Sequence, residues 1–397
     1  MISPMADPEP APQSDDLESA ADRLASQGDI AGARALLEQV VQASPERLDT
    51  WLKLAAVRRA GGDSPGAQAA ISSALSVDPL HLVALLSRAR LLESDGQRLE
   101  AAKAYTRALA QLPDDDSELQ SGLKPLVAHA RQVSGAWMAR ANAVWDAAID
   151  ADPSLDNRHR ARLSRFKSNA LRETRYYHSE PTHYHYPGLR EREFHEVEDF
   201  PWLASIAAAA GDILEELHAL LEDRSARAEP YIQQPNDVPL RQWTALNHSL
   251  DWTAFHLLSG GHRVAENADR CPRTMAALAQ VTQPQIAGRS PNAMFSLLKP
   301  HTHIPPHTGI ANTRLVCHLP LIVPPDCWFR VGATKRRWVV GEPFVFDDTI
   351  EHEAANESDL PRIVLIFDSW HPDLDAGERA AVRRVMEADE AEHGAPL

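Results

Sequence analysis

The sequence of 397 residues predicts an α+β protein in which an all-α repeat region is followed by a β-rich, jelly-roll domain with flanking helices. The first observation behind this prediction is an internal period of about 34 residues in the first third of the chain. The second is a series of short apolar segments from Met294 onward, separated by proline and glycine, which is typical of strands in a barrel or jelly roll. The third is a histidine pair, His307 and His352, set among those segments.

Three sets of residues carry the N-terminal period: Gly28, Gly62 and Gly96; Ala33, Ala67 and Ala101; Pro45, Pro79 and Pro113. The glycine opens the turn between two helices, the alanine lets the helices approach closely, and the proline ends the second helix. This pattern resembles the tetratricopeptide repeat. A fourth, degraded unit is expected to end at Pro153, with Ala136 in the place of the turn glycine. We therefore expect a disordered start over residues 1–16 and a solenoid over residues 17–155.

The remaining chain divides into three parts. A basic segment, residues 156–185, is expected to be a helical linker, and the β-rich domain is expected over residues 186–374. Within that domain the apolar spacing of 201–222 predicts one amphipathic helix. Residues 375–397 predict a charged helix and tail that packs on the domain or forms a dimer contact. The expected strands are 294–298, 312–322, 327–331, 337–340, 343–346 and 362–367.

Composition excludes several classes of protein. A net charge of −16 argues against a nucleic-acid binder, which needs a basic surface to replace counterions. The chain has no run of about 18 apolar residues, so no membrane span is expected. Its start lacks the basic and apolar regions of a secretory signal, and its three cysteines have no Cys-x-x-Cys spacing. These features predict a cytoplasmic protein, while the oligomeric state stays open.

His307 and His352 could hold one metal ion. Two imidazoles on facing strands suit a redox iron site, whose usual facial triad adds a carboxylate in the pattern His-x-Asp. Here that third position is Gly309. The pair is therefore either no metal site at all or a site with two protein ligands and water in the third place.

Several blocks, in order and at fixed spacing, resemble the aspartyl/asparaginyl β-hydroxylase family of iron(II)- and 2-oxoglutarate-dependent oxygenases. They are Tyr186-Pro-Gly-Leu189, Phe200-Pro-Trp-Leu203, Glu266-Asn-Ala-Asp-Arg-Cys-Pro-Arg-Thr274, Pro306-His-Thr-Gly309, Asn312-Thr-Arg-Leu-Val-Cys-His-Leu319, Phe346-Asp-Asp-Thr-Ile-Glu-His-Glu353 and Asp368-Ser-Trp-His-Pro372. The resemblance implies a double-stranded β-helix (jelly-roll, cupin-like) fold, with His307 and His352 as the metal ligands. It also implies Fe(II), O2 and the cosubstrate 2-oxoglutarate.

A cosubstrate carboxylate needs a cation, and Arg362 at the start of an apolar strand is the candidate, with a surface cap as the alternative. The resemblance implies that Ser296 adds a hydroxyl to the same carboxylate and that His318 contacts the cosubstrate near the metal. Arg314 would hold an acidic substrate group or the keto-acid end, or else form a structural salt bridge. The animal members carry Arg-x-Arg here, but Val316 replaces the second arginine.

Other polar residues near the pair are expected to play supporting roles. Asp347 and Asp348 are expected to orient ligands or cap backbone amides rather than bind metal. His301 and His303 are expected in a loop, near the site or on the surface, because prolines flank them.

The leading functional hypothesis is a catalytic dioxygenase that hydroxylates a C–H bond, most simply the β-carbon of Asp or Asn in a peptide, protein or amino acid. A lipid acyl chain or another small molecule is the alternative substrate. Two rival hypotheses are a halogenase and a non-catalytic scaffold or adaptor in which the repeats bind a partner. The solenoid favours a peptide or protein partner.

Overall fold

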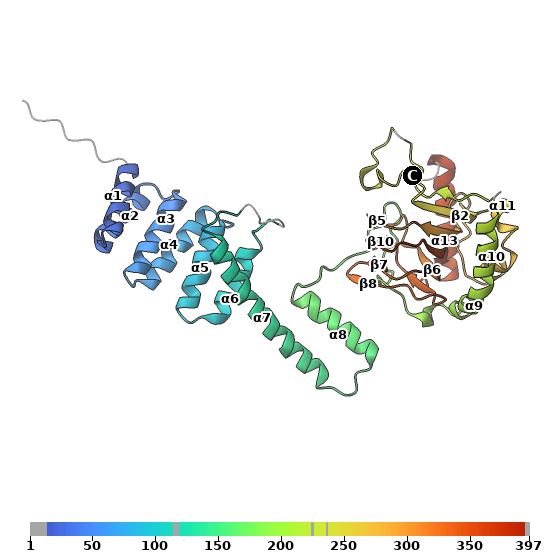
Figure 1. Ribbon diagram of the computed structural model, residues 1–397, viewed down its shortest axis with the longest axis horizontal. Coiled ribbons are helices and arrows are strands. Elements are labelled where there is room, and N and C mark those ends of the chain that lie inside the picture. Colours follow the sequence, from blue (N-terminus) through green and yellow to red (C-terminus); the bar gives the residue numbers. More distant parts are fainter. Residues whose placement is uncertain (1–13, 114–118, 224–225, 236, 394–397) are drawn as a thin grey trace, which may run out of the picture. The chain divides into compact units, whose positions relative to one another are not determined.

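The computed structural model describes residues 14–113, 119–223, 226–235 and 237–393. The chain divides into two compact units, Met1–Leu171 and Arg172–Leu397. The first unit is helical and the second is built mainly from strands (Figure 1). The α+β class predicted from the sequence is therefore confirmed, although the boundary between the units falls inside the segment expected to be a linker.

Helix pairs form the first part of the helical unit (Figure 1). Gly28, Gly62 and Gly96 all have positive φ, between +76° and +86°, which is the left-handed conformation that glycine adopts at little cost in a helix–helix turn. Ala33 and Ala67, where neighbouring helices pack together, are fully buried. The tetratricopeptide prediction is thus confirmed. The helices are α1 Ser14–Ser26, α2 Ile30–Ala43, α3 Leu48–Ala60, α4 Ser64–Val77, α5 Leu82–Ser94 and α6 Arg98–Leu109.

One expectation for this unit is wrong, and another is corrected at its end. Of the segment expected to be disordered, residues 14–16 begin helix α1, and residues 1–13 lie outside the described residues. The fourth repeat does not form, because α7 runs unbroken from Lys124 to Asp150 through Ala136. Between Pro125, in its first turn, and Pro153, beyond its end, only Gly135 weakens the helix, and one glycine costs only about 1 kcal/mol.

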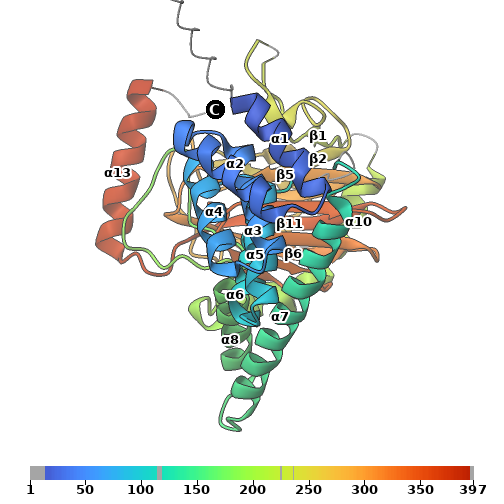
Figure 2. The same ribbon diagram turned by 90° about the vertical axis from the view of Figure 1, so that its left-hand side faces the viewer.

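Helix α8, Asn157–Ala170, belongs to the first unit rather than to a linker. It runs beside α7 in both ribbon views (Figures 1 and 2). The Lys167 ammonium lies 2.6 Å from the Asp146 carboxylate, and the Trp145 and Phe166 rings are 5.4 Å apart. These contacts hold the basic helix against the end of α7.

Two antiparallel sheets form the second unit. The larger has the order β1-β2-β4-β11-β6-β9, with β3 beside β2, and the smaller has the order β5-β10-β7-β8. Apolar side chains of both sheets share one core, as in a double-stranded β-helix. The strands are β1 Glu229–Pro230, β2 Trp252–Ser259, β3 His262–Arg263, β4 Ala293–Leu298, β5 Thr302–His307, β6 Arg314–Ile322, β7 Cys327–Val331, β8 Thr334–Arg336, β9 Phe344–Phe346, β10 His352–Asn356 and β11 Arg362–Trp370.

Helices cover the other face of the larger sheet. Ile213 and Leu217 of α10 (Ala210–Glu222) are fully buried in a core that they share with Phe295 and Leu365 of the sheet. The single helix expected over 201–222 is two helices, because one residue, Ala209, separates α9 (Leu203–Ala208) from α10. The remaining helices are α11 Ala265–Ala268, α12 Pro272–Leu278 and the 3-10 turns Val197–Asp199 and Arg241–Trp243.

The C-terminal helix α13, Ala376–His393, packs on its own domain. Its Val382 and Met386 join an apolar cluster with Trp370, and its Glu378 accepts a hydrogen bond from the hydroxyl of Tyr186 at 2.9 Å. Within the described part of the chain, no helix combines the length and the apolar character needed to cross a bilayer.

The smaller sheet contains strands that the sequence did not predict. Strand β5 includes Pro305 and Pro306, which are tolerated because β5 lies at the edge of the sheet and needs hydrogen bonds on one side only. His303 is therefore on a strand rather than in a loop, and His301 just precedes it. The strand expected at 337–340 is instead β8 at 334–336, and β10 was not expected. In the larger sheet, β2 was not expected either.

Candidate functional site

The two histidines lie side by side on neighbouring strands of the smaller sheet. His307 ends β5, His352 begins β10, and the two residues are direct partners in the antiparallel ladder. Their ring centroids are 4.0 Å apart. The register of one strand pair thus places two imidazoles at the mouth of the space between the sheets.

Each imidazole is held by a backbone carbonyl of its own segment. The Nδ1–H of His307 donates to the carbonyl of Pro305 at 2.8 Å, and the Nδ1–H of His352 donates to the carbonyl of Ile350 at 3.1 Å. A carbonyl only accepts, so the proton resides on Nδ1 and the Nε2 lone pair is free on both rings. Burial lowers the pKa of His307 to about 3 and that of His352 to about 4. Both rings are therefore neutral near pH 7, as metal ligands must be.

Asp348 lies where the side chain of residue 309 would be. A Cβ atom built on Gly309 would collide with the carboxylate of Asp348, which comes from the turn between β9 and β10. One oxygen of this buried carboxylate, Oδ1, has no hydrogen-bond partner among the described residues. Within the described ranges no three or more His, Cys, Asp and Glu side chains group as a metal site. The site thus offers two imidazole nitrogens, from His307 and His352, with the carboxylate of Asp348 nearby.

Arg314 pairs with two carboxylates in this region. Its Nη2 lies 3.0 Å from Oδ2 of Asp348, and its Nη1 lies 3.6 Å from Oδ1 of Asp368. Burial raises the pKa of Asp348, and the nearby Arg314 opposes that shift. Asp347 has a different role, because it accepts the backbone N–H of Thr349 at 2.9 Å, as expected of a capping residue.

Arg362 lies 1% exposed at the start of β11, among apolar neighbours. In the part of the chain that the structure describes, its Nε and Nη1 have no hydrogen-bond partner, and its guanidinium carbon lies 4.9 Å from the Trp338 ring centroid. Burial lowers its pKa to about 10, so the group stays charged at neutral pH. A buried cation without an acceptor is costly, and a carboxylate ligand would remove that cost.

Ser296 and His318 present further donors to the same space. The Ser296 hydroxyl accepts a hydrogen bond from Nε1 of Trp252 at 3.0 Å, which leaves its own O–H free to donate. His318 Nδ1 accepts from Nε1 of Trp338 at 3.3 Å, so its Nε2 carries the proton. Burial keeps the pKa of His318 well below its usual value. His318 is therefore a neutral donor, with the tautomer opposite to that of His307 and His352.

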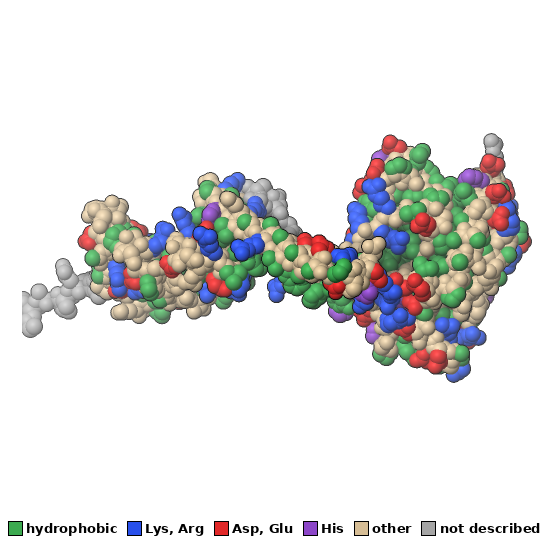
Figure 3. Space-filling view, turned by 90° about the horizontal axis from the view of Figure 1, so that it is seen from below, with side chains coloured by type: hydrophobic (Ala, Val, Ile, Leu, Met, Phe, Trp, Pro, Cys, Tyr) green, Lys and Arg blue, Asp and Glu red, His purple; other side chains and the backbone are tan. Residues whose placement is uncertain are grey.

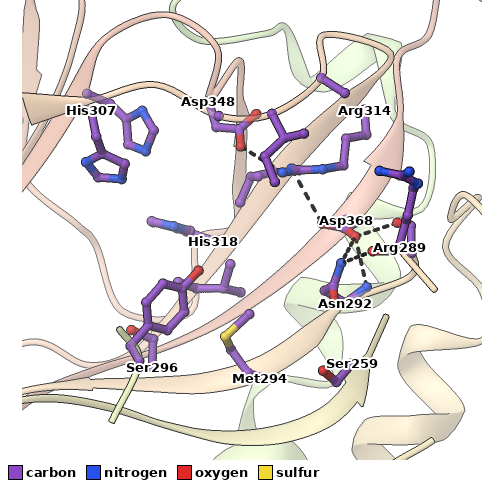
Figure 4. Close-up of a pocket in the computed structure, with 18 of the residues that line it drawn as sticks. Ser259, Arg289, Asn292, Met294, Ser296, His307, Arg314, His318, Asp348 and Asp368 are labelled. Carbon is purple, nitrogen blue, oxygen red and sulfur yellow. Dashed lines mark hydrogen bonds and ion pairs between the residues drawn. The ribbon is translucent and has the colours of Figure 1, made fainter. Parts of the chain in front are cut away.

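All six predicted site residues line one cavity of about 700 Å³ between the sheets (Figure 4). His307, Asp348 and Arg314 lie along one side, and Ser296 and Met294 of β4 lie opposite. Sequence reasoning missed Trp252 and Trp338, which fix the orientation of Ser296 and His318. The missed strand β2 carries Trp252, so recognising that strand would have given the signal.

Gly309→Asp is expected to destabilise the fold by about 1–3 kcal/mol, because the new side chain must displace the Asp348 carboxylate from its place beside Arg314. Adding Asp348→Ala should recover part of this loss. Thermal unfolding of both single variants and the double variant measures the coupling. Additive effects of the two substitutions would show that the two side chains do not compete for one place.

Two family profiles match the chain. Residues 208–372 match the family described as Aspartyl/Asparaginyl beta-hydroxylase, and residues 24–88 match a tetratricopeptide repeat. The first match contains all six residues predicted for the cavity site.

Curated relatives resemble the same part of the chain. Aspartate beta-hydroxylase domain-containing protein 2 of Xenopus tropicalis is 32% identical over 177 residues, which are 44% of this chain and 45% of that protein. Aspartyl/asparaginyl beta-hydroxylase of Homo sapiens is 34% identical over 134 residues, 33% of this chain and 17% of that protein. Ornithine lipid ester-linked acyl 2-hydroxylase of Rhizobium tropici is 32% identical over 190 residues, 47% of this chain and 63% of that protein. This chain thus spans less than two thirds of each.

Solved structures also resemble part of the chain. The Yersinia enterocolitica type III secretion chaperone SycD, in complex with a peptide of the translocator YopD, has a TM-score of 0.28 and 19% identity and covers 31% of this chain and 89% of its own. The Sgt2 TPR domain of Aspergillus fumigatus has a TM-score of 0.27 and 19% identity and covers 37% of this chain and 89% of its own.

Proposed function

We propose that this chain is an iron(II)- and 2-oxoglutarate-dependent dioxygenase that hydroxylates a C–H bond, because residues 208–372 match the aspartyl/asparaginyl β-hydroxylase family. The observation that carries the proposal is the buried guanidinium of Arg362, unpartnered at two nitrogens among the described residues, in the same cavity as the free Nε2 atoms of His307 and His352. A site for a metal and a site for a carboxylate thus share one enclosed space.

The donors present suit the proposed groups. His307 and His352 supply two borderline nitrogen ligands, and water would complete the metal's coordination, since the described residues supply no third protein ligand there. Arg362 and the Ser296 hydroxyl would hold the distal carboxylate of 2-oxoglutarate. The Nε2–H of His318 would donate to an oxygen nearer the metal. Each of these residues thus keeps a polar atom available for the ligand assigned to it.

When bound, iron supplies the oxygen chemistry. The reaction consumes R–H, O2 and 2-oxoglutarate and yields R–OH, succinate and CO2. One oxygen atom of O2 enters R–OH and the other enters succinate, so R–H and 2-oxoglutarate are each oxidised by two electrons. The chain's own contribution is orientation and exclusion of water. Trp338 and Trp252 fix the two neutral donors, and the aromatic ring of Trp243 packs 4.9 Å from that of His307.

Two substrate classes follow from the relatives' names: an Asp or Asn β-carbon and a lipid acyl chain. The first is favoured by the family name and the second by the apolar side chains of Met294, Val316 and Ile366 in the cavity. The halogenase hypothesis gains no support, because the space that glycine would leave for a halide is filled by Asp348.

The tetratricopeptide unit supports a partner-binding role, since such repeats are typical of peptide and protein binding. Helices α3, α5 and α7 line a groove of about 430 Å³ that includes apolar residues and the side chains of Arg59 and Arg90. We propose that a peptide or protein segment binds there. On the face shown in Figure 3, the helical unit carries both basic and acidic side chains. A purely structural scaffold is the rival, but it would give no reason to keep the Arg362 guanidinium buried with unsatisfied donors.

Anaerobic binding followed by turnover tests the proposal. The full chain should bind one equivalent of Fe(II), and 2-oxoglutarate should bind only the protein that contains a divalent metal, because one carboxylate reaches Arg362 while the keto-acid end reaches the metal. Admission of O2 should then release succinate slowly even without substrate. A protein that binds neither iron nor 2-oxoglutarate would be the scaffold instead.

A further inference from the structure

We infer that the substrate segment presented to the metal is uncharged and apolar, and that the cavity rejects a carboxylate there. This inference rests on the proposed function and narrows its substrate to one whose reacting segment carries no carboxylate. Two features of the cavity support this inference. The surface opposite the histidine pair, here called the floor, is apolar, and the arginines on the substrate side are already paired with carboxylates of the chain.

The cations that line the cavity, among the described residues, are Arg289, Arg314 and Arg362. Arg362 is assigned to the cosubstrate. Arg314 lies 3.0 Å from a carboxylate oxygen of Asp348 and 3.6 Å from one of Asp368, so one guanidinium faces two carboxylates. An acidic substrate group next to Arg314 would meet this pair of negative charges, and like charges at such distances repel strongly in a buried site.

Arg289, at the far end of the cavity from His307, is occupied in the same way (Figure 4). Its Nη2 lies 3.1 Å from Oδ2 of Asp389 and 3.1 Å from Oε2 of Glu390, both on α13. His256, which also lines this part of the cavity, adds no positive charge, because burial lowers its pKa. Among the described residues that line the substrate side, each cation is thus paired with two carboxylates of the chain; Nη1 of Arg314 makes no hydrogen bond but lies 3.6 Å from the Asp368 carboxylate.

The floor opposite the metal-facing histidines is apolar. Val316 of β6 and Met294 of β4 are 8% and 6% exposed, and Ile366 of β11 lies between them, paired with Met294 in the sheet. An alkyl segment would bury these side chains and leave no polar group unsatisfied. A carboxylate in their place would lose its hydration beside side chains that themselves offer no donor.

Matched acceptors that differ by one carboxylate test the inference. One pair is octanamide and 8-amino-8-oxooctanoic acid, for an acyl-chain substrate, and the other is N-acetyl-norleucinamide and N-acetyl-2-aminoadipic amide, for an amino-acid side chain. Succinate release above the substrate-free rate gives kcat/KM for each. In at least one pair, the neutral member should exceed the acidic one by at least about tenfold, since an unpaired buried charge costs more than about 1.4 kcal/mol. Mass spectrometry of the added oxygen identifies which pair is used.

Val316→Arg should reverse this preference by supplying a free cation beside the floor, whereas Val316→Met, of similar length but uncharged, should keep it. Should the arginine variant fail to fold, Asp368→Asn provides the second test, because it removes one carboxylate from Arg314 and should raise kcat/KM for the acidic member only.

Two results have different meanings. If wild-type protein uses the acidic members as well as or better than the neutral ones, the inference is wrong while the dioxygenase proposal stands. If the protein binds no iron and no 2-oxoglutarate and releases no succinate under any condition, the proposed function itself fails, and the inference fails with it.

Discussion

Replacing His307 or His352 with alanine is expected to weaken Fe(II) binding by on the order of 100-fold or more. Loss of a second-sphere partner alone costs about 10–100-fold, and loss of one of only two protein ligands costs more. Both rings are free at Nε2 and share one space, with centroids 4.0 Å apart. Iron stoichiometry after anaerobic dialysis measures the effect, and near-ultraviolet circular dichroism checks the fold.

His303→Ala is the matched control, since His303 lies on the same strand, β5, but pairs with Glu353 at 2.8 Å and is exposed. Iron binding should be unchanged in this variant. If His303→Ala lost iron while His307→Ala retained it, the metal would lie on the outer face of the smaller sheet, and the cavity would have another purpose.

Replacing Arg362 with methionine is expected to weaken 2-oxoglutarate binding at least about thirty-fold, from the loss of a buried charge-assisted contact worth about 2–5 kcal/mol. The same change should leave the ligand-free protein at least as stable as wild type. Methionine fills similar apolar space, and the substitution removes a guanidinium whose Nε and Nη1 donors are unsatisfied among the described residues. Calorimetric titration and thermal unfolding, each with and without 2-oxoglutarate, measure the two effects.

The two readouts separate a ligand-binding arginine from a structural one. A structural arginine would be needed for folding, so Arg362→Met would lower the melting temperature and change cosubstrate affinity little. A cosubstrate-binding arginine gives the opposite result, in which wild type alone gains stability from added 2-oxoglutarate. Arg336→Met is the control: that arginine is half-buried and, like Arg362, packs against an aromatic ring, 4.2 Å from the Phe344 ring centroid, but it does not line the cavity.

Local chemistry let the sequence predict the repeats and most strands of the larger sheet. The glycines at 28, 62 and 96 impose the turns because only glycine adopts their positive φ at little cost. The apolar run of β11 identifies a central strand because both faces of that strand are buried. These features depend on residues close together in the chain.

The errors occur where the partner of a segment decides its conformation. Strand β5 contains two prolines and is a strand only because it is an edge strand paired with β10. The end of the repeats also depends on packing, since α8 returns along α7 through contacts such as Lys167 with Asp146. The conformational propensity of a single segment reveals neither the edge position of β5 nor the packing of α8 against α7.

The sequence by itself determined that two histidines, a glycine in the acid position and an arginine on an apolar strand occur in this order. Only the tertiary structure decided what surrounds them. It brings Asp348 into the space beside Gly309, turns His318 into a donor through Trp338, and leaves two donors of Arg362 without a partner among the described residues. The physical reason is that tautomers, unpaired charges and filled spaces depend on contacts between strands far apart in sequence, which only the paired sheets create.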